Sequence, residues 1–209
     1  MAIYIPQEFQ RAAEVLSAVG RELHRQGWST ATSSNYSLRL NSECCAITTS
    51  GQDKGKLVPQ DIMVVDLDGQ ALTPQTPSAE TLLHTRLYQQ KAQIGAVLHT
   101  HSKPATLMGL MLKDQSVLHL AGYELLKAFA GIRTHESVVT VPIFENTQDI
   151  DKLAIRVSQY LDEHSQTYGY LIRGHGLYTW GKDMQEARRH LEAFEFLLSC
   201  ELEMLKLRY

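Results

Sequence analysis

The sequence predicts an α/β fold in which a mostly antiparallel central sheet is flanked by helices. Short alternating or β-branched segments arrive in blocks, within 36–66 and within 137–180, and turns rich in glycine, serine or asparagine separate them. Segments with apolar residues at helical spacing lie before, between and after these blocks. Because strands and helices do not alternate strictly and the chain contains no GxGxxG motif, a dinucleotide-binding fold is disfavoured.

The N-terminal part of the chain supplies two predicted helices around three predicted strands. The first helix ends before Gly27 and presents an apolar face formed by Phe9, Ala12, Leu16, Val19 and Leu23. The strands are expected at 36–40, 46–49 and 62–66. The second helix starts at Pro77 and Ser78 and runs to about Gln90, with Glu80 in its first turn.

The remaining predicted elements are two single strands, a hairpin and three helices. A strand at 94–98 leads through a junction with His101 into a helix from Pro104 to about Leu112. A strand at 137–143, an amphipathic helix at 149–163 and a hairpin of 169–172 with 177–180 follow. The last helix has the strongest pattern, and its length suggests that part of it covers a neighbour. Its apolar positions are Met184, Ala187, Leu191, Phe194, Leu198, Leu202 and Leu205.

Length and composition favour one globular domain over residues 1–209 that acts on a small molecule. The net charge is -3 and no basic tract is present, so general attraction to nucleic acid or an anionic membrane is not expected. Residues 1–6 lack the pattern of a signal peptide and no apolar run has membrane-spanning length, which predicts a cytoplasmic protein. Cys44, Cys45 and Cys200 imply no disulfide framework.

His99 and His101, at the end of a predicted strand, are the clearest candidates for function. Residues i and i+2 of an extended backbone project to the same side, so both imidazoles can face one ion. His175 stands between Gly174 and Gly176, which allow a close approach of backbone and ligand. Three imidazoles leave an open position on a divalent metal, where a substrate oxygen can be polarised. The alternative for each histidine alone is a surface or hydrogen-bonded side chain.

Three polar segments predict a phosphate-binding pocket. Segment 48–55 offers hydroxyls, a flexible glycine backbone and a lysine, which together can bind a phosphate. A plain glycine-rich turn would have the same composition. Two more groups of hydroxyls, at 33–35 and at Ser78, stand next to the start of a strand and of a helix, and this convergence supports the phosphate interpretation.

Over nearly its whole length the chain resembles the class II aldolase family. The matching residues are Ser34, Asn35, Thr49, Ser50, Gly51, Gly55, Leu57, Pro59, Asp61, Glu80, His99, His101 and His175. Ser34 stands where aldolases commonly carry glycine. The resemblance implies a three-layer αβα fold, a sugar-phosphate substrate, one Zn²⁺ per subunit on the three histidines, and a homotetramer with sites between subunits. It also implies phosphate contacts from Ser34, Asn35, Ser50, Gly51 and Ser78.

Segments 77–81, 122–127 and 141–146 resemble a dehydratase branch of this family more narrowly. That resemblance implies a lyase that converts 5-methylthioribulose 1-phosphate to 5-methylthio-2,3-dioxopentyl phosphate in methionine salvage. Glu124 would be the acid/base that takes the C3 proton and helps the C4 hydroxyl leave, and Glu80 a fourth metal ligand or second acid/base. The alternatives are a class II aldolase or epimerase acting on another sugar phosphate, and a catalytically idle scaffold.

Both glutamates also have a purely structural interpretation. Glu80 suits the first turn of a helix, where an acidic side chain is favourable. Glu124 would be unremarkable as a solvated side chain beside Lys127 on a short helix. His84 follows Glu80 by one helical turn, and we expect it to have a helix-face role.

Overall fold

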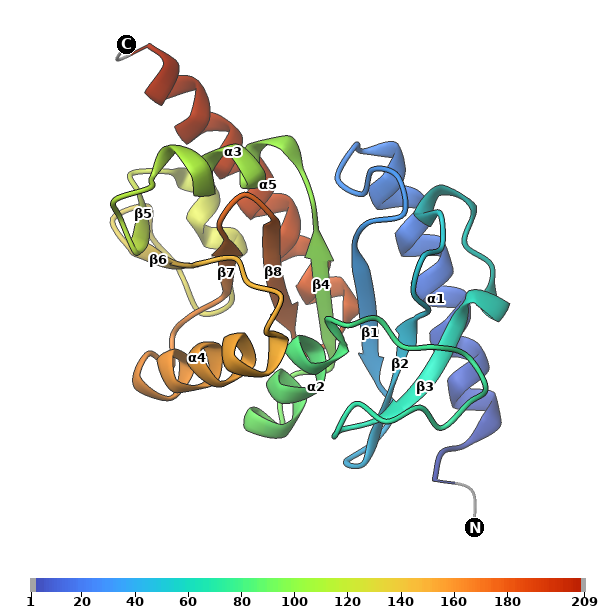
Figure 1. The fold of residues 1–209 in the computed structure, drawn as a ribbon. Coiled ribbons are helices and arrows are strands. Elements are labelled where there is room, and N and C mark those ends of the chain that lie inside the picture. Colours follow the sequence, from blue (N-terminus) through green and yellow to red (C-terminus); the bar gives the residue numbers. More distant parts are fainter. Residues whose placement is uncertain (1–2, 208–209) are drawn as a thin grey trace.

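The computed structural model describes residues 3–207, in which eight strands form one sheet (Figure 1). Residues 1, 2, 208 and 209 of the predicted domain lie outside the described residues. The strands are β1 (Asn35–Arg39), β2 (Cys44–Thr48), β3 (Ile62–Asp66), β4 (Ala96–Thr100), β5 (Val117–Ala121), β6 (Val138–Phe144), β7 (Gly169–Ile172) and β8 (Gly176–Gly181). Their order is β3-β2-β1-β4-β8-β7-β6-β5, and only the β6–β7 pair is parallel. The prediction of a mostly antiparallel sheet is confirmed.

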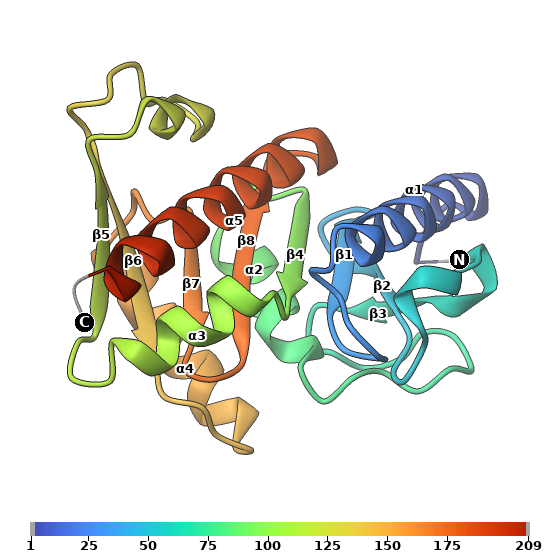
Figure 2. The same cartoon turned by 90° about the horizontal axis from the view of Figure 1, so that it is seen from above.

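Helices cover both faces of this sheet, so the expected three-layer arrangement is also confirmed (Figure 2). One face carries α1 (Pro6–Arg25), α3 (Lys103–Met111) and α5 (Met184–Lys206), which share one hydrophobic core with the sheet. The other face carries α2 (Thr81–Gln90) and α4 (Ile150–Glu163), which enclose a second core. Helices α1, α4 and α5 each bury one apolar stripe, as the period of their sequences requires. No helix among the described residues is both long and apolar enough to cross a membrane.

The structure corrects the predicted start of α2. The helix begins at Thr81 rather than at Pro77 and Ser78, and Glu80 is its N-cap residue. The Ser78 hydroxyl accepts a hydrogen bond from the Glu80 backbone N–H at 3.3 Å, and the Ser78 carbonyl accepts one from Thr81 N–H at 3.1 Å. Serine side chains that bond the local backbone in this way compete with helix formation. Glu80 is therefore held in a turn that faces the end of the sheet.

Short elements between the main ones were not all predicted. Strand β5 lies in a region for which the sequence predicts no element. It is followed by the 3-10 helix η3 (Glu124–Ala128), where the sequence allowed a short helix with Glu124 and Lys127. Only Leu118 and Leu120 are buried in β5, so its apolar pattern is too short to separate from a loop. Two further 3-10 helices, η1 (Lys54–Lys56) and η2 (Pro59–Asp61), precede β3.

Strand register brings three distant segments to one edge of the sheet. The start of β1 lies beside the end of β4, because the two strands are antiparallel with Asn35 opposite His99. The end of β4 in turn pairs with β8, with Thr100 opposite Leu177. The turn between β7 and β8, which carries His175, therefore lies next to His99.

Candidate metal centre and phosphate pocket

Three histidines and one glutamate converge at this edge of the sheet. Glu80, His99, His101 and His175 each offer one ligand atom, and these atoms all lie within 4.8 Å of one another. The imidazole rings of His99 and His101 have centroids 4.5 Å apart, and the ring of His175 lies 5.0 Å from that of His99. The structure thus brings together the three histidines predicted as metal ligands and Glu80, which was predicted as a fourth ligand or a second acid/base.

His99 is held in a single tautomer by the backbone. Its Nδ1 lies 2.9 Å from the carbonyl oxygen of Leu177, and because a carbonyl can only accept, Nδ1 carries the proton. The lone pair is then on Nε2, which lies 3.2 Å from Nε2 of His175. The ring is fully buried and stacks on Tyr178 with a centroid distance of 3.9 Å. Burial lowers the pKa of His99 well below its ordinary value, so the imidazole stays neutral and available as a ligand.

Glu80 lies between the histidines and Asn35. Its Oε1 is 2.8 Å from Nε2 of His175, and its Oε2 is 3.5 Å from Nε2 of His99. The side-chain amide of Asn35 donates to Oε2 at 2.7 Å. Burial acts to raise the pKa of Glu80, but the hydrogen bond to His175, the two imidazoles and Asn35 outweigh it. The pKa therefore lies well below its ordinary value, and Glu80 is an anion at neutral pH.

A buried chain of hydrogen bonds fixes Asn35 from behind. Because its amide nitrogen donates to Glu80, its oxygen faces His84, whose Nε2 donates to it. Nδ1 of His84 then accepts from the Ser37 hydroxyl at 2.8 Å, and Ser37 accepts from Tyr88 at 2.8 Å. Burial lowers the pKa of His84 to about 3, so this ring is neutral. We expected His84 only to lie on a helix face. The structure shows that its side chain also orients Asn35, which donates a hydrogen bond to Glu80.

A cavity of about 220 Å³ lies directly beside Glu80, His101 and His175. All five residues predicted to contact phosphate line it: Ser34, Asn35, Ser50, Gly51 and Ser78. Ser34 adopts a φ of 73°, a left-handed conformation in which glycine is unstrained. The cavity is walled mainly by hydroxyl and backbone groups, which suits a phosphate.

Lys54, the lysine of the predicted phosphate-binding segment 48–55, also lines this cavity. The sequence indicated a lysine in the phosphate-binding segment without indicating that its side chain is fully buried. The contact of His84 with Asn35 was not predicted either, because the spacing of His84 from Glu80 indicates only a shared helix face. The contacts of Lys54 with Thr32 and of His84 with Asn35 both join segments that are distant in sequence.

Glu124 is not brought to this site within the single chain. It begins η3, and its side chain is 70% exposed. Its carboxylate pairs with Lys127 and lies 3.6 Å from Nδ1 of His135, and the hydrogen bond from Lys127 is the largest contribution to a lowered pKa. Glu124 is neither part of the metal-ligating group nor a lining residue of the 220 Å³ cavity.

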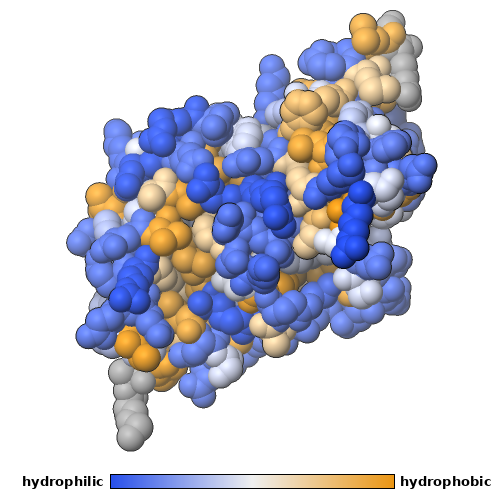
Figure 3. All heavy atoms as spheres, turned by 180° about the vertical axis from the view of Figure 1, so that it is seen from behind, coloured by the Kyte–Doolittle hydropathy of each residue, from blue (hydrophilic) through white to orange (hydrophobic). Residues whose placement is uncertain are grey.

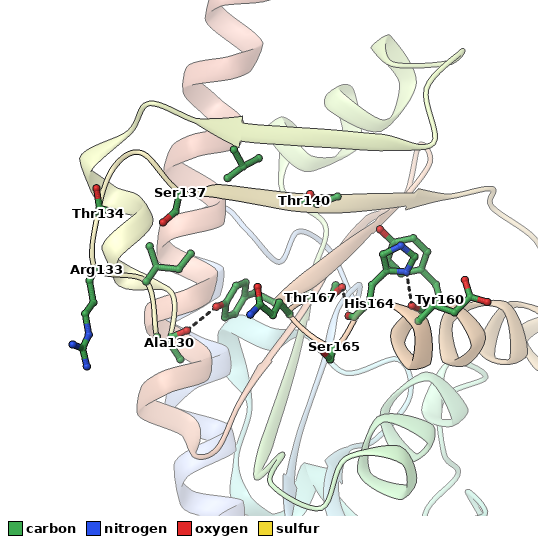
Figure 4. A pocket seen from close by; sticks show the side chains of 15 residues that line it. Ala130, Arg133, Thr134, Ser137, Thr140, Tyr160, His164, Ser165 and Thr167 are labelled. Carbon is green, nitrogen blue, oxygen red and sulfur yellow. Dashed lines mark hydrogen bonds between the residues drawn. The ribbon is translucent and has the colours of Figure 1, made fainter.

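A larger cavity, of about 900 Å³, lies elsewhere, between the segment after η3 and the turn from α4 to β7 (Figure 4). Its side chains include Arg133, Tyr160 and His164, and the His164 ring stacks on Tyr160 at 4.0 Å. Within residues 3–207, no group of potential metal ligands is found in this cavity. The predicted metal ligands and phosphate contacts therefore lie at the smaller cavity of about 220 Å³.

The chain is similar to known proteins over almost its whole length. The family model described as "Class II Aldolase and Adducin N-terminal domain" matches residues 14–202. A protein of Xanthomonas campestris named methylthioribulose-1-phosphate dehydratase is 57% identical over 206 residues, which cover 98% of this chain and 94% of the relative. A protein of the same name from Stenotrophomonas maltophilia is 54% identical, with coverage of 98% and 96%.

Solved structures with the same fold include sugar-phosphate aldolases. L-fuculose-1-phosphate aldolase from Thermus thermophilus superposes with a TM-score of 0.75 at 24% identity, covering 98% of both chains. Sugar-phosphate aldolase from Thermotoga maritima superposes with a TM-score of 0.69 at 18% identity, covering 94% of this chain and 96% of the other. At these identities the likeness concerns the fold alone.

Proposed function

This chain belongs to the class II aldolase and adducin family, and from that premise we propose that it is a metal-dependent dehydratase of 5-methylthioribulose 1-phosphate. The product would be 5-methylthio-2,3-dioxopentyl phosphate, formed in methionine salvage. One observation carries the proposal: three imidazoles and a carboxylate converge beside a hydroxyl-lined cavity of about 220 Å³. The names of relatives at 57% identity support the substrate. We also propose that residues 1–209 form a single domain.

The donor set fits a divalent cation. The lone pair of His99 Nε2 is directed toward His175 and Glu80, and imidazole nitrogens and a carboxylate gathered this closely can surround a divalent cation. Such a cation would be held by Glu80, His99, His101 and His175, and it would act as a Lewis acid toward the substrate carbonyl. We propose Zn²⁺, one per subunit, because histidine nitrogens and carboxylate oxygens are among the ligands of catalytic zinc sites.

The chain's own residues would bind the substrate and move its protons. The hydroxyl and backbone groups around Ser34, Ser50 and Ser78 would bind the phosphate. A carboxylate must remove the C3 proton and return a proton to the departing C4 hydroxyl, which leaves as water. The resulting enol takes up a proton at C4 and becomes the 2,3-diketone. We assign these transfers to Glu124, because Glu80 is engaged by His175 and Asn35.

Glu124 can serve this role only if another copy of the chain supplies it. We propose a homotetramer with sites between subunits, in the cytoplasm, in which Glu124 of one copy reaches the histidines of its neighbour. Glu124 is exposed on η3. This helix lies in the olive segment between β5 and β6, which projects away from the rest of the chain in Figure 2. Exposed apolar side chains support subunit contacts, namely Leu125 on η3 with Phe196 and Met204 on α5. Figure 3 shows hydrophobic atoms beside the C-terminal end of α5.

Turnover of synthetic 5-methylthioribulose 1-phosphate tests this function. We expect the wild type to form the diketone, and Glu124→Gln to keep its bound metal while losing the reaction. Glu80→Gln is measured in parallel for both metal content and rate. Formation of carbon–carbon cleavage fragments, or of an epimer without loss of water, would instead assign an aldolase or epimerase. A protein that binds metal but leaves the substrate unchanged would contradict the enzyme proposal.

A further inference from the structure

Lys54 is a fully buried lysine in the wall of the candidate phosphate pocket. Its side chain is 1% exposed, and it lies in η1, immediately after the segment that contains Ser50 and Gly51. The ammonium donates to the carbonyl oxygen of Gln52 at 2.8 Å and to that of Thr32 at 3.3 Å. These carbonyls belong to the two loops on either side of the cavity, so Lys54 connects both loops at the pocket wall.

The ammonium has donors and charge that these two contacts do not satisfy. A lysine ammonium has three N–H donors, and the two carbonyls engage two of them. Among the described residues, no carboxylate forms an ion pair with Lys54, although Asp53, Asp61 and Glu80 act on it through space. Burying a charge without a paired partner costs free energy. With one N–H donor and its charge unpaired, the buried ammonium can bind an anion that enters the cavity.

Lys54 also differs from every other group that lines the cavity. The remaining lining side chains are hydroxyls, an amide, two imidazoles and the carboxylate of Glu80, and no other lysine or arginine is among them. Neutral hydroxyl and backbone donors can orient a phosphate but carry no net charge, and Lys54 is the cationic side chain among the lining residues. Burial lowers the pKa of Lys54 to about 8, so the side chain still carries its charge at neutral pH.

We propose that Lys54 is the cationic ligand of the substrate phosphate, binding it with its third N–H while the other two hold the loops at Thr32 and Gln52 in place. This inference rests on the proposed function only for the identity of the sugar phosphate. The phosphate group itself can be tested alone. Lys54 would contribute to binding equally before and during the reaction, since the phosphate takes no part in bond breaking.

The decisive variant is Lys54→Gln, whose side-chain amide keeps two N–H donors but carries no charge. Lys56→Gln is the matched control, because Lys56 is two residues away and its side chain is 86% exposed. Lys54→Arg keeps the charge. Binding of inorganic phosphate to the metal-free protein is measured by titration calorimetry, and kcat and KM are measured with the ketose phosphate.

We expect Lys54→Gln to weaken phosphate binding and to raise KM by roughly 10- to 100-fold, the range for a hydrogen bond to a charged group, with kcat nearly unchanged. Lys56→Gln should match the wild type, and Lys54→Arg should recover part of the affinity. The preference of the enzyme for the phosphorylated over the unphosphorylated sugar should fall by the same factor. If dehydration fails in the wild type while phosphate binding still depends on Lys54, only the proposed reaction is wrong.

Unchanged phosphate affinity in a folded Lys54→Gln protein would overturn the inference and leave Lys54 as a connector of two loops. If that variant does not fold, a crystal structure of the wild type with inorganic phosphate gives the answer. Phosphate oxygen within hydrogen-bond distance of Lys54 Nζ would support the inference. Phosphate bound in the cavity without contact to Nζ, or found only outside the cavity, would overturn it.

Discussion

The side-chain amide of Asn35 donates a hydrogen bond to Oε2 of Glu80 across 2.7 Å, and this contact joins β1 to the turn before α2. The opposite end of the same amide accepts from His84, so Asn35 cannot rotate without losing both contacts. Glu80 in turn contacts His175 at 2.8 Å. The orientation of a candidate metal ligand is therefore set by a buried histidine that does not itself touch the metal-ligating group.

Replacement of His84 tests this positioning. We expect His84→Phe to lower metal affinity or kcat by roughly 10- to 100-fold, as other losses of ligand-orienting contacts do, because Asn35 loses its anchor. Metal content, kcat and thermal stability are measured together. Tyr88→Phe is the control at the far end of the hydrogen-bond chain and should have a much smaller effect. An equal loss in both variants would indicate a general packing defect instead of positioning.

Removal of the metal should abolish activity and lower stability. A cation that binds only the folded protein stabilises it, so a chelator should lower the melting temperature, and added Zn²⁺ should restore both properties. His99→Ala should lose the metal and at least about a thousand-fold in rate, since the chemistry depends on it. His119→Ala, on the solvent side of β5, is the control. Full activity of metal-free protein would refute the metal-dependent mechanism.

Mixed oligomers test the assignment of Glu124. Glu124→Gln supplies intact histidines, whereas His99→Ala supplies an intact Glu124, so neither protein alone should be active. If sites form between subunits, mixing them after dissociation should restore activity at about a quarter of the sites. The proteins are mixed in equal amounts, and turnover is compared with each variant alone. No recovery from subunits that do exchange would show that Glu124 does not act from a neighbouring copy.

Glu195 should make the stability of the protein depend on pH. It is buried on α5 and accepts a hydrogen bond from Thr100, the residue between His99 and His101, at 2.9 Å. Burial raises the pKa of Glu195 from 4.5 to about 7. The folded protein thus holds a proton that the unfolded chain has released, and the stability contributed by this group is lost as the pH rises from 4.5 to 7.

Glu195→Gln removes this titration. The stability of the variant relative to the wild type should rise with pH across that window, by up to about 3 kcal/mol. Urea unfolding of both metal-free proteins at several pH values measures the difference. Glu192→Gln, an exposed change on the same helix, should show no such trend. A constant difference between Glu195→Gln and wild type at every pH would contradict the raised pKa.

Local patterns were sufficient to predict the main elements and the paired histidines of the candidate metal centre. The apolar stripes of α1, α4 and α5 follow a helical period that each segment carries by itself. His99 and His101 share one side because alternate residues of a strand always do. The family motifs then pointed to Glu80 and His175, which the structure gathers around the same point.

Elements without a strong local pattern were predicted less well. The strand β5 has only two buried residues and is stabilised by pairing with β6, which lies some twenty residues later in the chain. The start of α2 depended on a serine-centred turn rather than on helix propensity. In both cases a contact outside the predicted pattern decided the conformation.

The sequence by itself determined the three-layer architecture, the family and the histidines of the candidate metal centre, because periodicity and motif are properties of short segments. Only the tertiary structure decided that His84 orients Asn35, that Lys54 is buried in the pocket wall, and that Glu124 lies apart from the histidines of its own chain. Strand register and loop packing create these relationships, and both arise from contacts between residues that are far apart in sequence.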